Sequence, residues 1–71
     1  MPSSLTVGTT LTNLSAFVSP IGDSFRPGTL FCVDLVGRST RIRTTTTDCV
    51  VWIQGSTLTA AASSAGQFRP V

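Results

Sequence analysis

Apolar and polar residues alternate along short segments of the chain, a period of two that predicts β-strands. Leu5 and Val7 lie between polar residues, and Gly8 separates them from a second such stretch that ends at Val18. Residues 19–24 contain Pro, Gly, Asp and Ser, which favour a loop. β-Branched Thr and Val are frequent, and Pro or Gly interrupts each long segment, so we expect hardly any helix.

The clearest predicted element is a hairpin of two strands joined by a turn. Its parts are residues 29–36, 37–40 and 41–46. Pairing about the turn would place Leu35 opposite Ile42 and would bring Asp34 beside Arg43, so that unlike charges are neighbours. The side chains expected to face the core are Phe31, Val33, Leu35 and Ile42.

Residues 49–53 are apolar on both faces, which is typical of a central strand covered on both sides. Trp52 in this segment is expected to be a core residue whose indole N–H needs a hydrogen-bond partner. Residues 54–57 would then turn the chain into 58–62, where small side chains allow another backbone to approach closely.

The fold class that this pattern predicts is all-β, a small antiparallel sandwich or partly open barrel of about five to six short strands. One domain would span residues 1–71, with extended arms at 1–3 and 63–71. A chain of 71 residues buries only about 60% of the surface that it exposes when unfolded, so its stability alone would be marginal. We therefore expect contacts with other subunits to stabilise it.

The composition removes most of the residues that catalysis uses. His, Lys, Glu and Tyr are absent, and Thr and Ser make up close to a third of the chain. General acid–base catalysis depends mainly on the missing types, and a Ser or Cys nucleophile needs an adjacent base. The remaining candidates are Asp23, Asp34, Asp48, Cys32 and Cys49. We expect no catalytic residue, no cofactor and no small-molecule substrate.

The two cysteines, Cys32 and Cys49, are too few and too far apart for a zinc site, so no metal is expected. A bridge between them would contribute about 3 kcal/mol by closing a loop. Both lie in apolar segments, and the N-terminal residues resemble no export signal, so two buried thiols are the favoured interpretation. No apolar stretch approaches the ~20 residues of a membrane span, and no membrane contact is expected.

The tripeptide Phe-Arg-Pro occurs twice, at residues 25–27 and 68–70. Arg before Pro favours extended backbone, and each Phe is large for so small a core. We interpret both copies as arms that dock into neighbouring subunits, the C-terminal one by adding to a sheet edge; coincidence and ordinary loop chemistry are the alternative. The partner-binding residues in this interpretation are Phe25, Arg26, Pro27, Phe68, Arg69, Pro70 and Val71.

All five basic residues are Arg, and the net charge is only +2. Arg38, Arg41 and Arg43 cluster at the hairpin, where they could bind phosphate or an acidic partner surface. The alternative is a solvated hairpin face on which Asp34 pairs with one of them. Single-strand binders place aromatic side chains along such a groove, and none is adjacent here, which weakens the nucleic-acid interpretation.

Four features of the chain have a counterpart in one class of proteins. They are the Thr/Ser-rich strand pattern, Arg without Lys, the lack of catalytic residues, and the Gly/Ala/Ser-rich tail that ends in Phe-Arg-Pro-Val. In these features the chain resembles the small decoration, cement and minor structural proteins of tailed phage virions. The resemblance implies an all-β, oligomeric subunit that binds the major capsid protein and strengthens the shell, within a virion assembled in the host cytoplasm. The expected function is a non-enzymatic structural subunit, and the alternative is a small nucleic-acid-binding barrel that uses Arg38, Arg41 and Arg43.

Overall fold

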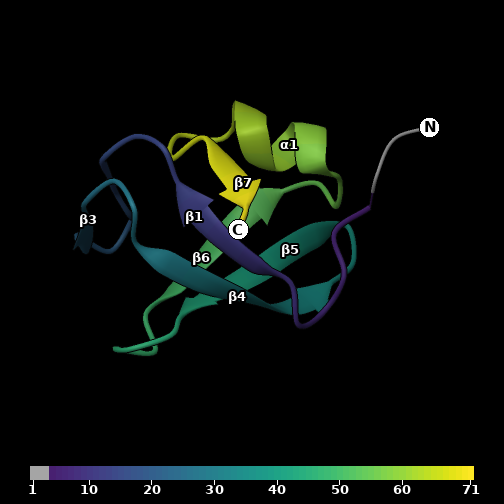
Figure 1. The fold of residues 1–71 in the computed structure, drawn as a ribbon, viewed down its shortest axis with the longest axis horizontal. Coiled ribbons are helices and arrows are strands. Elements are labelled where there is room, and N and C mark those ends of the chain that lie inside the picture. The colour runs from purple at the N-terminus through teal and green to yellow at the C-terminus, as the bar shows by residue number, and fades with distance from the viewer. Residues whose placement is uncertain (1–3) are drawn as a thin grey trace.

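The structure is a computed structural model, which describes residues 4–71 (Figure 1). Its elements are β1 (Thr10–Asn13), β2 (Phe17–Val18), β3 (Ser24–Phe25), β4 (Leu30–Val36), β5 (Ser39–Thr44), β6 (Val50–Gln54), α1 (Leu58–Ser63) and β7 (Phe68–Pro70). Five strands form an antiparallel sheet in the order β6-β5-β4-β1-β7, which curls into a half-barrel, and β2 and β3 form a second, two-stranded sheet. The predicted all-β class is confirmed.

The β4–β5 hairpin has the strands that the sequence predicts, but its register differs. Val33 pairs with Ile42, whereas Leu35 pairs with Arg41, and the register shifts between Val33 and Leu35. The prediction that Leu35 lies opposite Ile42 is wrong because the turn is centred on Arg38, with Val36 opposite Thr40, which sets Leu35 opposite Arg41. A bulge at Asp34 then shifts the register by one further residue. As a result Leu35 is 43% exposed, whereas Phe31, Val33 and Ile42 are buried as predicted.

Four phenylalanines form the centre of the core. Phe31 on β4 meets Phe25 at a ring-centroid distance of 5.3 Å and Phe68 at 5.2 Å. Phe17 on β2 packs against Phe25 at 4.9 Å and against Phe68 at 5.3 Å. These contacts hold the β2–β3 hairpin and β7 against the middle of the five-stranded sheet, so that elements from both halves of the chain share one core.

The C-terminal segment is not the extended arm predicted for residues 63–71. Its last strand, β7, pairs with β1 of the same chain, with Leu11 opposite Pro70 and Asn13 opposite Phe68. The Val71 N–H continues this pairing by donating to the Thr10 carbonyl at 3.0 Å. The prediction of an arm fails because Phe68, which is 2% exposed, finds its place in the core of its own chain.

A short helix, α1, includes residues 58–62, although the sequence pattern led us to expect hardly any helix. Thr57 caps it, because the Thr57 hydroxyl accepts a hydrogen bond from the Ala60 N–H at 3.1 Å. Ala61 is fully buried against the sheet, and the helix contacts β6 and β7. The three consecutive alanines favour a helix over a strand once such a cap is available.

Candidate protein interface around Trp52

β6 is an edge strand of the five-stranded sheet, and Trp52 points out of the molecule from it. Trp52 is 55% exposed, whereas its neighbours Val51 and Ile53 are buried. The prediction that Trp52 is a core residue in a central strand covered on both faces is therefore wrong. Side chains alternate along a strand, so Val50 and Gln54 share the outward face with Trp52.

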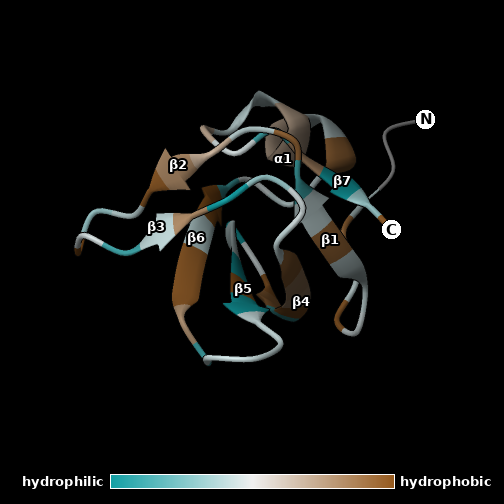
Figure 2. Cartoon of the chain, turned by 60° about the vertical axis from the view of Figure 1, so that its left-hand side comes forward, coloured by the Kyte–Doolittle hydropathy of each residue, from teal (hydrophilic) through white to brown (hydrophobic). Residues whose placement is uncertain are grey.

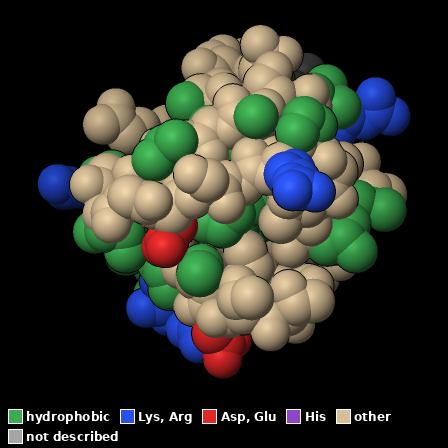
Figure 3. Space-filling model, turned by 90° about the vertical axis from the view of Figure 1, so that its left-hand side faces the viewer, with side chains coloured by type: hydrophobic (Ala, Val, Ile, Leu, Met, Phe, Trp, Pro, Cys, Tyr) green, Lys and Arg blue, Asp and Glu red, His purple; other side chains and the backbone are tan. Residues whose placement is uncertain are grey.

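Apolar side chains from β2 and from the loop between β2 and β3 extend this exposed face. Ile21 is 81% and Val18 64% exposed. We call the set Val18, Pro20, Ile21, Val50 and Trp52 the Trp52 surface. Figure 2 shows the apolar strand β6 with the β2–β3 hairpin beside it, and Figure 3 shows hydrophobic side chains reaching the surface at the end of the molecule that carries this hairpin. The loop and the strand thus expose apolar side chains around one shared hollow.

The Trp52 surface is hollowed rather than flat. One hollow of about 330 Å³ lies between the loop and β6, and its lining includes Pro20, Ile21, Val50 and Trp52. A second hollow of about 240 Å³ shares Pro20 and Trp52 with the first and reaches inward to the core residue Phe68. Apolar hollows of this kind receive side chains of a binding partner.

The outer backbone edge of β6 is unpaired. The Thr44 N–H donates to the Cys49 carbonyl at 3.0 Å, which sets the alternation of the β5–β6 ladder. Val50, Trp52 and Gln54 therefore direct their N–H and C=O groups away from β5, and no other part of residues 4–71 bonds to them. β6 also has none of the charges, prolines or bulges that usually protect an edge strand.

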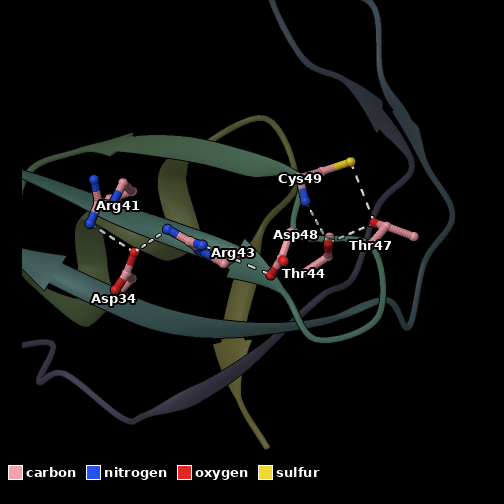
Figure 4. A network of polar contacts seen from close by, with 7 residues as sticks. All are labelled: Asp34, Arg41, Arg43, Thr44, Thr47, Asp48 and Cys49. Carbon is pink, nitrogen blue, oxygen red and sulfur yellow. Dashed lines mark hydrogen bonds and ion pairs between the residues drawn. The ribbon is translucent and has the colours of Figure 1, made fainter.

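The arginines of the hairpin do not form an open basic patch (Figure 4). Asp34 Oδ2 lies 2.8 Å from Arg41 Nη2 and accepts a hydrogen bond from Arg43 Nη2 at 2.9 Å. Asp48 Oδ1 lies 3.9 Å from Arg43 Nη1. The predicted neighbourhood of Asp34 and Arg43 is confirmed as an ion pair, although the bulge changes the register. Two arginines face two aspartates here, so little net charge is left to attract a phosphate.

Two further observations bear on whether this arginine cluster could bind a phosphate. The Nε atoms of Arg41 and Arg43 are buried and have no hydrogen-bond partner within residues 4–71, so a phosphate could not reach them without displacing other groups. Arg38 lies in the turn between β4 and β5, is exposed, and makes no ion pair with any described residue. Of the three clustered arginines, only Arg38 presents an uncompensated charge.

The two Phe-Arg-Pro copies are divided between core and surface. Phe25 and Phe68 are buried in the core of their own chain, so the expectation that they dock into neighbours is wrong. Their partners in the motif, Arg26, Pro27, Arg69, Pro70 and the adjoining Val71, are exposed. A role in partner binding stays a prediction for these five exposed residues.

The remaining chemistry of the described chain is sparse. Cys32 and Cys49 are free thiols, both half-buried rather than buried as expected. Residues 4–71 contain no group of three or more His, Cys, Asp and Glu that could hold a metal ion. Among the described residues, no helix has the length and apolar character needed to cross a membrane.

Comparison of the chain with protein-family models, with curated proteins and with solved structures finds no match.

Proposed function

We propose that the chain is a non-enzymatic structural subunit that binds other protein subunits through the Trp52 surface. One observation carries this proposal: an exposed tryptophan stands on an unpaired edge strand, beside the exposed side chains of Val18 and Ile21. Monomeric proteins seldom expose contiguous apolar surface of this kind, and they usually protect a free sheet edge. A protein partner would cover both features at once.

The assembly that we propose is a virion, in which the chain acts as a decoration, cement or minor capsid protein. Its partners would be further copies of the chain or the major capsid protein. The compositional resemblance to such proteins supports this assignment. The small size of the chain supports it too, because a core of few side chains gains stability when a subunit interface buries further apolar surface.

Binding of nucleic acid has less support from the geometry. Arg41 and Arg43 are engaged by Asp34, and within residues 4–71 the aromatic rings pack against one another rather than against an arginine. The exposed Trp52 lies among apolar side chains rather than beside a row of free cations. Protein is therefore the partner that this surface fits better.

The test is the light-scattering mass of natively purified protein, with absorbance recorded at 260 and 280 nm in the same run. We expect the chain to elute in an assembly larger than one chain and free of nucleic acid. The variant W52S/I21S should no longer enter this assembly. V7S, which changes another exposed apolar residue, should still assemble. A monomer that carries 260 nm-absorbing material would overturn the proposal, and so would an assembly that W52S/I21S leaves intact.

A further inference from the structure

We propose that a second copy of this chain covers the free edge of β6, with the two β6 strands antiparallel about a two-fold axis at Trp52. This inference rests on the proposed function, because it names the partner of the same Trp52 surface. It follows from three properties of β6: the direction of its backbone groups, the side chains on its two faces, and the charges at its two ends.

The backbone edge of β6 matches a copy of itself. Val50, Trp52 and Gln54 carry the outward N–H and C=O groups, and Trp52 is the middle one of the three. An antiparallel copy centred on Trp52 sets Trp52 opposite Trp52, and Val50 opposite Gln54 of the second copy. All of these pairs are of the type that exchanges two hydrogen bonds, so every outward group of the three residues finds a partner.

The side chains fit the same register. On the buried face, Val51 would stand opposite Ile53 of the second copy, so an apolar side chain meets an apolar one at both positions. On the outward face the two Trp52 rings would be direct neighbours across the axis. No charged side chain belongs to β6, so the pairing places no like charges opposite each other within the strands.

The charges at the two ends of β6 are complementary under this symmetry. Asp48 lies two residues before Val50, the first residue of β6, and its side chain is 80% exposed, with only a long 3.9 Å contact to Arg43. Arg38 lies at the opposite end, because the neighbouring Ser39 pairs with Gln54. Antiparallel pairing brings Asp48 of each copy toward Arg38 of the other, which yields two equivalent attractive contacts. This complementarity favours a second copy over an unrelated strand, since an unrelated strand need not match both ends.

The first test reverses these charges one at a time in the purified chain, with self-association measured by sedimentation equilibrium. R38D and D48R should each weaken the dimer, by about three- to thirty-fold, because each sets like charges against one another at both ends. An equimolar mixture of the two variants should restore association to within about threefold of the wild type, because the mixed dimer contains only unlike pairs. Circular dichroism confirms that each variant is folded, and D48N serves as a control for the conformation of residue 48. A mixture that associates no better than its components would overturn the antiparallel arrangement.

The second test addresses the backbone edge. Q54P removes an outward N–H and leaves the β5–β6 hydrogen bonds intact, whereas Q54A keeps the N–H and changes only the side chain. We expect Q54P to weaken association at least tenfold more than Q54A does, because only Q54P loses the outward N–H.

The two proposals fail differently. If Q54P and both charge reversals associate like the wild type while W52S/I21S does not, the second-copy arrangement is wrong and the proposed function stands. If the purified chain alone is monomeric at about 1 mM but elutes in a larger natural assembly, the partner is another protein and this inference is overturned.

Discussion

The rings of Phe31 and Phe68 meet edge to face, with centroids 5.2 Å apart and planes at 89°. Phe31 lies in β4 near the middle of the sheet, and Phe68 lies in β7 at its edge and close to the C-terminus. Both side chains are almost fully buried. The last strand is therefore part of the core, and its loss should affect folding before it affects any assembly.

Replacing Phe68 by Ala should destabilise the fold by about 3–5 kcal/mol, the usual cost of removing a buried aromatic ring. A domain of this size has a total stability of about 4–10 kcal/mol, so much of the variant would be unfolded at 37 °C. Urea unfolding followed by circular dichroism measures the change. Arg69→Ala, at the neighbouring exposed position, is the control and should change stability by less than about 0.5 kcal/mol. Equal midpoints for the two variants would show that β7 is dispensable.

A second prediction concerns Asn13, a buried polar residue that the sequence pattern did not single out. Its Nδ2 donates to the carbonyls of Ser15 and Arg26 at 3.0 and 2.8 Å, and its Oδ1 accepts from the Thr29 N–H at 2.9 Å. Asn13→Ala should cost about 2–3 kcal/mol, because the Ser15 carbonyl loses its partner and the Arg26 carbonyl and the Thr29 N–H are left only with each other and the Thr29 hydroxyl.

Thr12→Ala, at the adjacent half-buried position, is the matched control for Asn13→Ala. Thermal unfolding of both variants compares the two positions. Amide exchange at Thr29 reports locally, because its N–H is the donor to Asn13. If exchange at Thr29 is unchanged in Asn13→Ala, the side chain of Asn13 does not hold this loop.

Gly66 gives a third prediction, since it lies where two rings leave no room. A Cβ at this position would lie 2.9 Å from atoms of Phe17 and of Phe68. Gly66→Ala should therefore destabilise the fold by about 1–3 kcal/mol through overpacking. At Gly37 the nearest atom to such a Cβ is 3.9 Å away, so Gly37→Ala should be close to neutral. Similar melting temperatures for the two variants would contradict the close packing around Gly66.

The sequence pattern predicts the parts of the fold that depend on alternation. The hairpin, the all-β class and the inward positions of Phe31, Val33 and Ile42 follow from a period of two. The bulge at Asp34 does not, because one inserted residue leaves the local composition unchanged. α1 was missed for a different reason: six residues are too few to show helical periodicity, and only the Thr57 cap before the alanines signals it.

The candidate interface was not predictable from the apolar run at residues 49–53. A strand buried on both faces and an edge strand with an exposed apolar face have the same composition. What separates them here is the order of strands in the sheet, which depends on contacts far apart in the sequence. Gln54 was the one available signal, because it shares the face of Val50 and Trp52 and a polar residue is rarely placed toward a core.

The Arg41–Asp34–Arg43 cluster supports a last prediction, on the role of its single carboxylate. Asp34 Oδ2 serves both guanidinium groups, at 2.8 and 2.9 Å. Asp34→Asn removes the negative charge and leaves two positive groups close together, so stability should fall by about 1 kcal/mol at low ionic strength. Because the three side chains are partly exposed, salt should screen the remaining repulsion, and the difference from the wild type should shrink in about 0.5 M NaCl.

The control for Asp34→Asn is Asp23→Asn, since Asp23 makes no ion pair within residues 4–71. Urea unfolding at low and high salt should show a salt-dependent loss of stability for Asp34→Asn and none for Asp23→Asn.

The Asp34→Asn protein also tests whether Asp34, by neutralising Arg41 and Arg43, keeps this cluster from binding a phosphate. If Asp34 is what neutralises Arg41 and Arg43, a fluorescent single-stranded oligonucleotide should bind the variant more tightly than the wild type at low salt. Equal oligonucleotide affinities would show that Asp34 does not limit the charge these arginines offer to a phosphate.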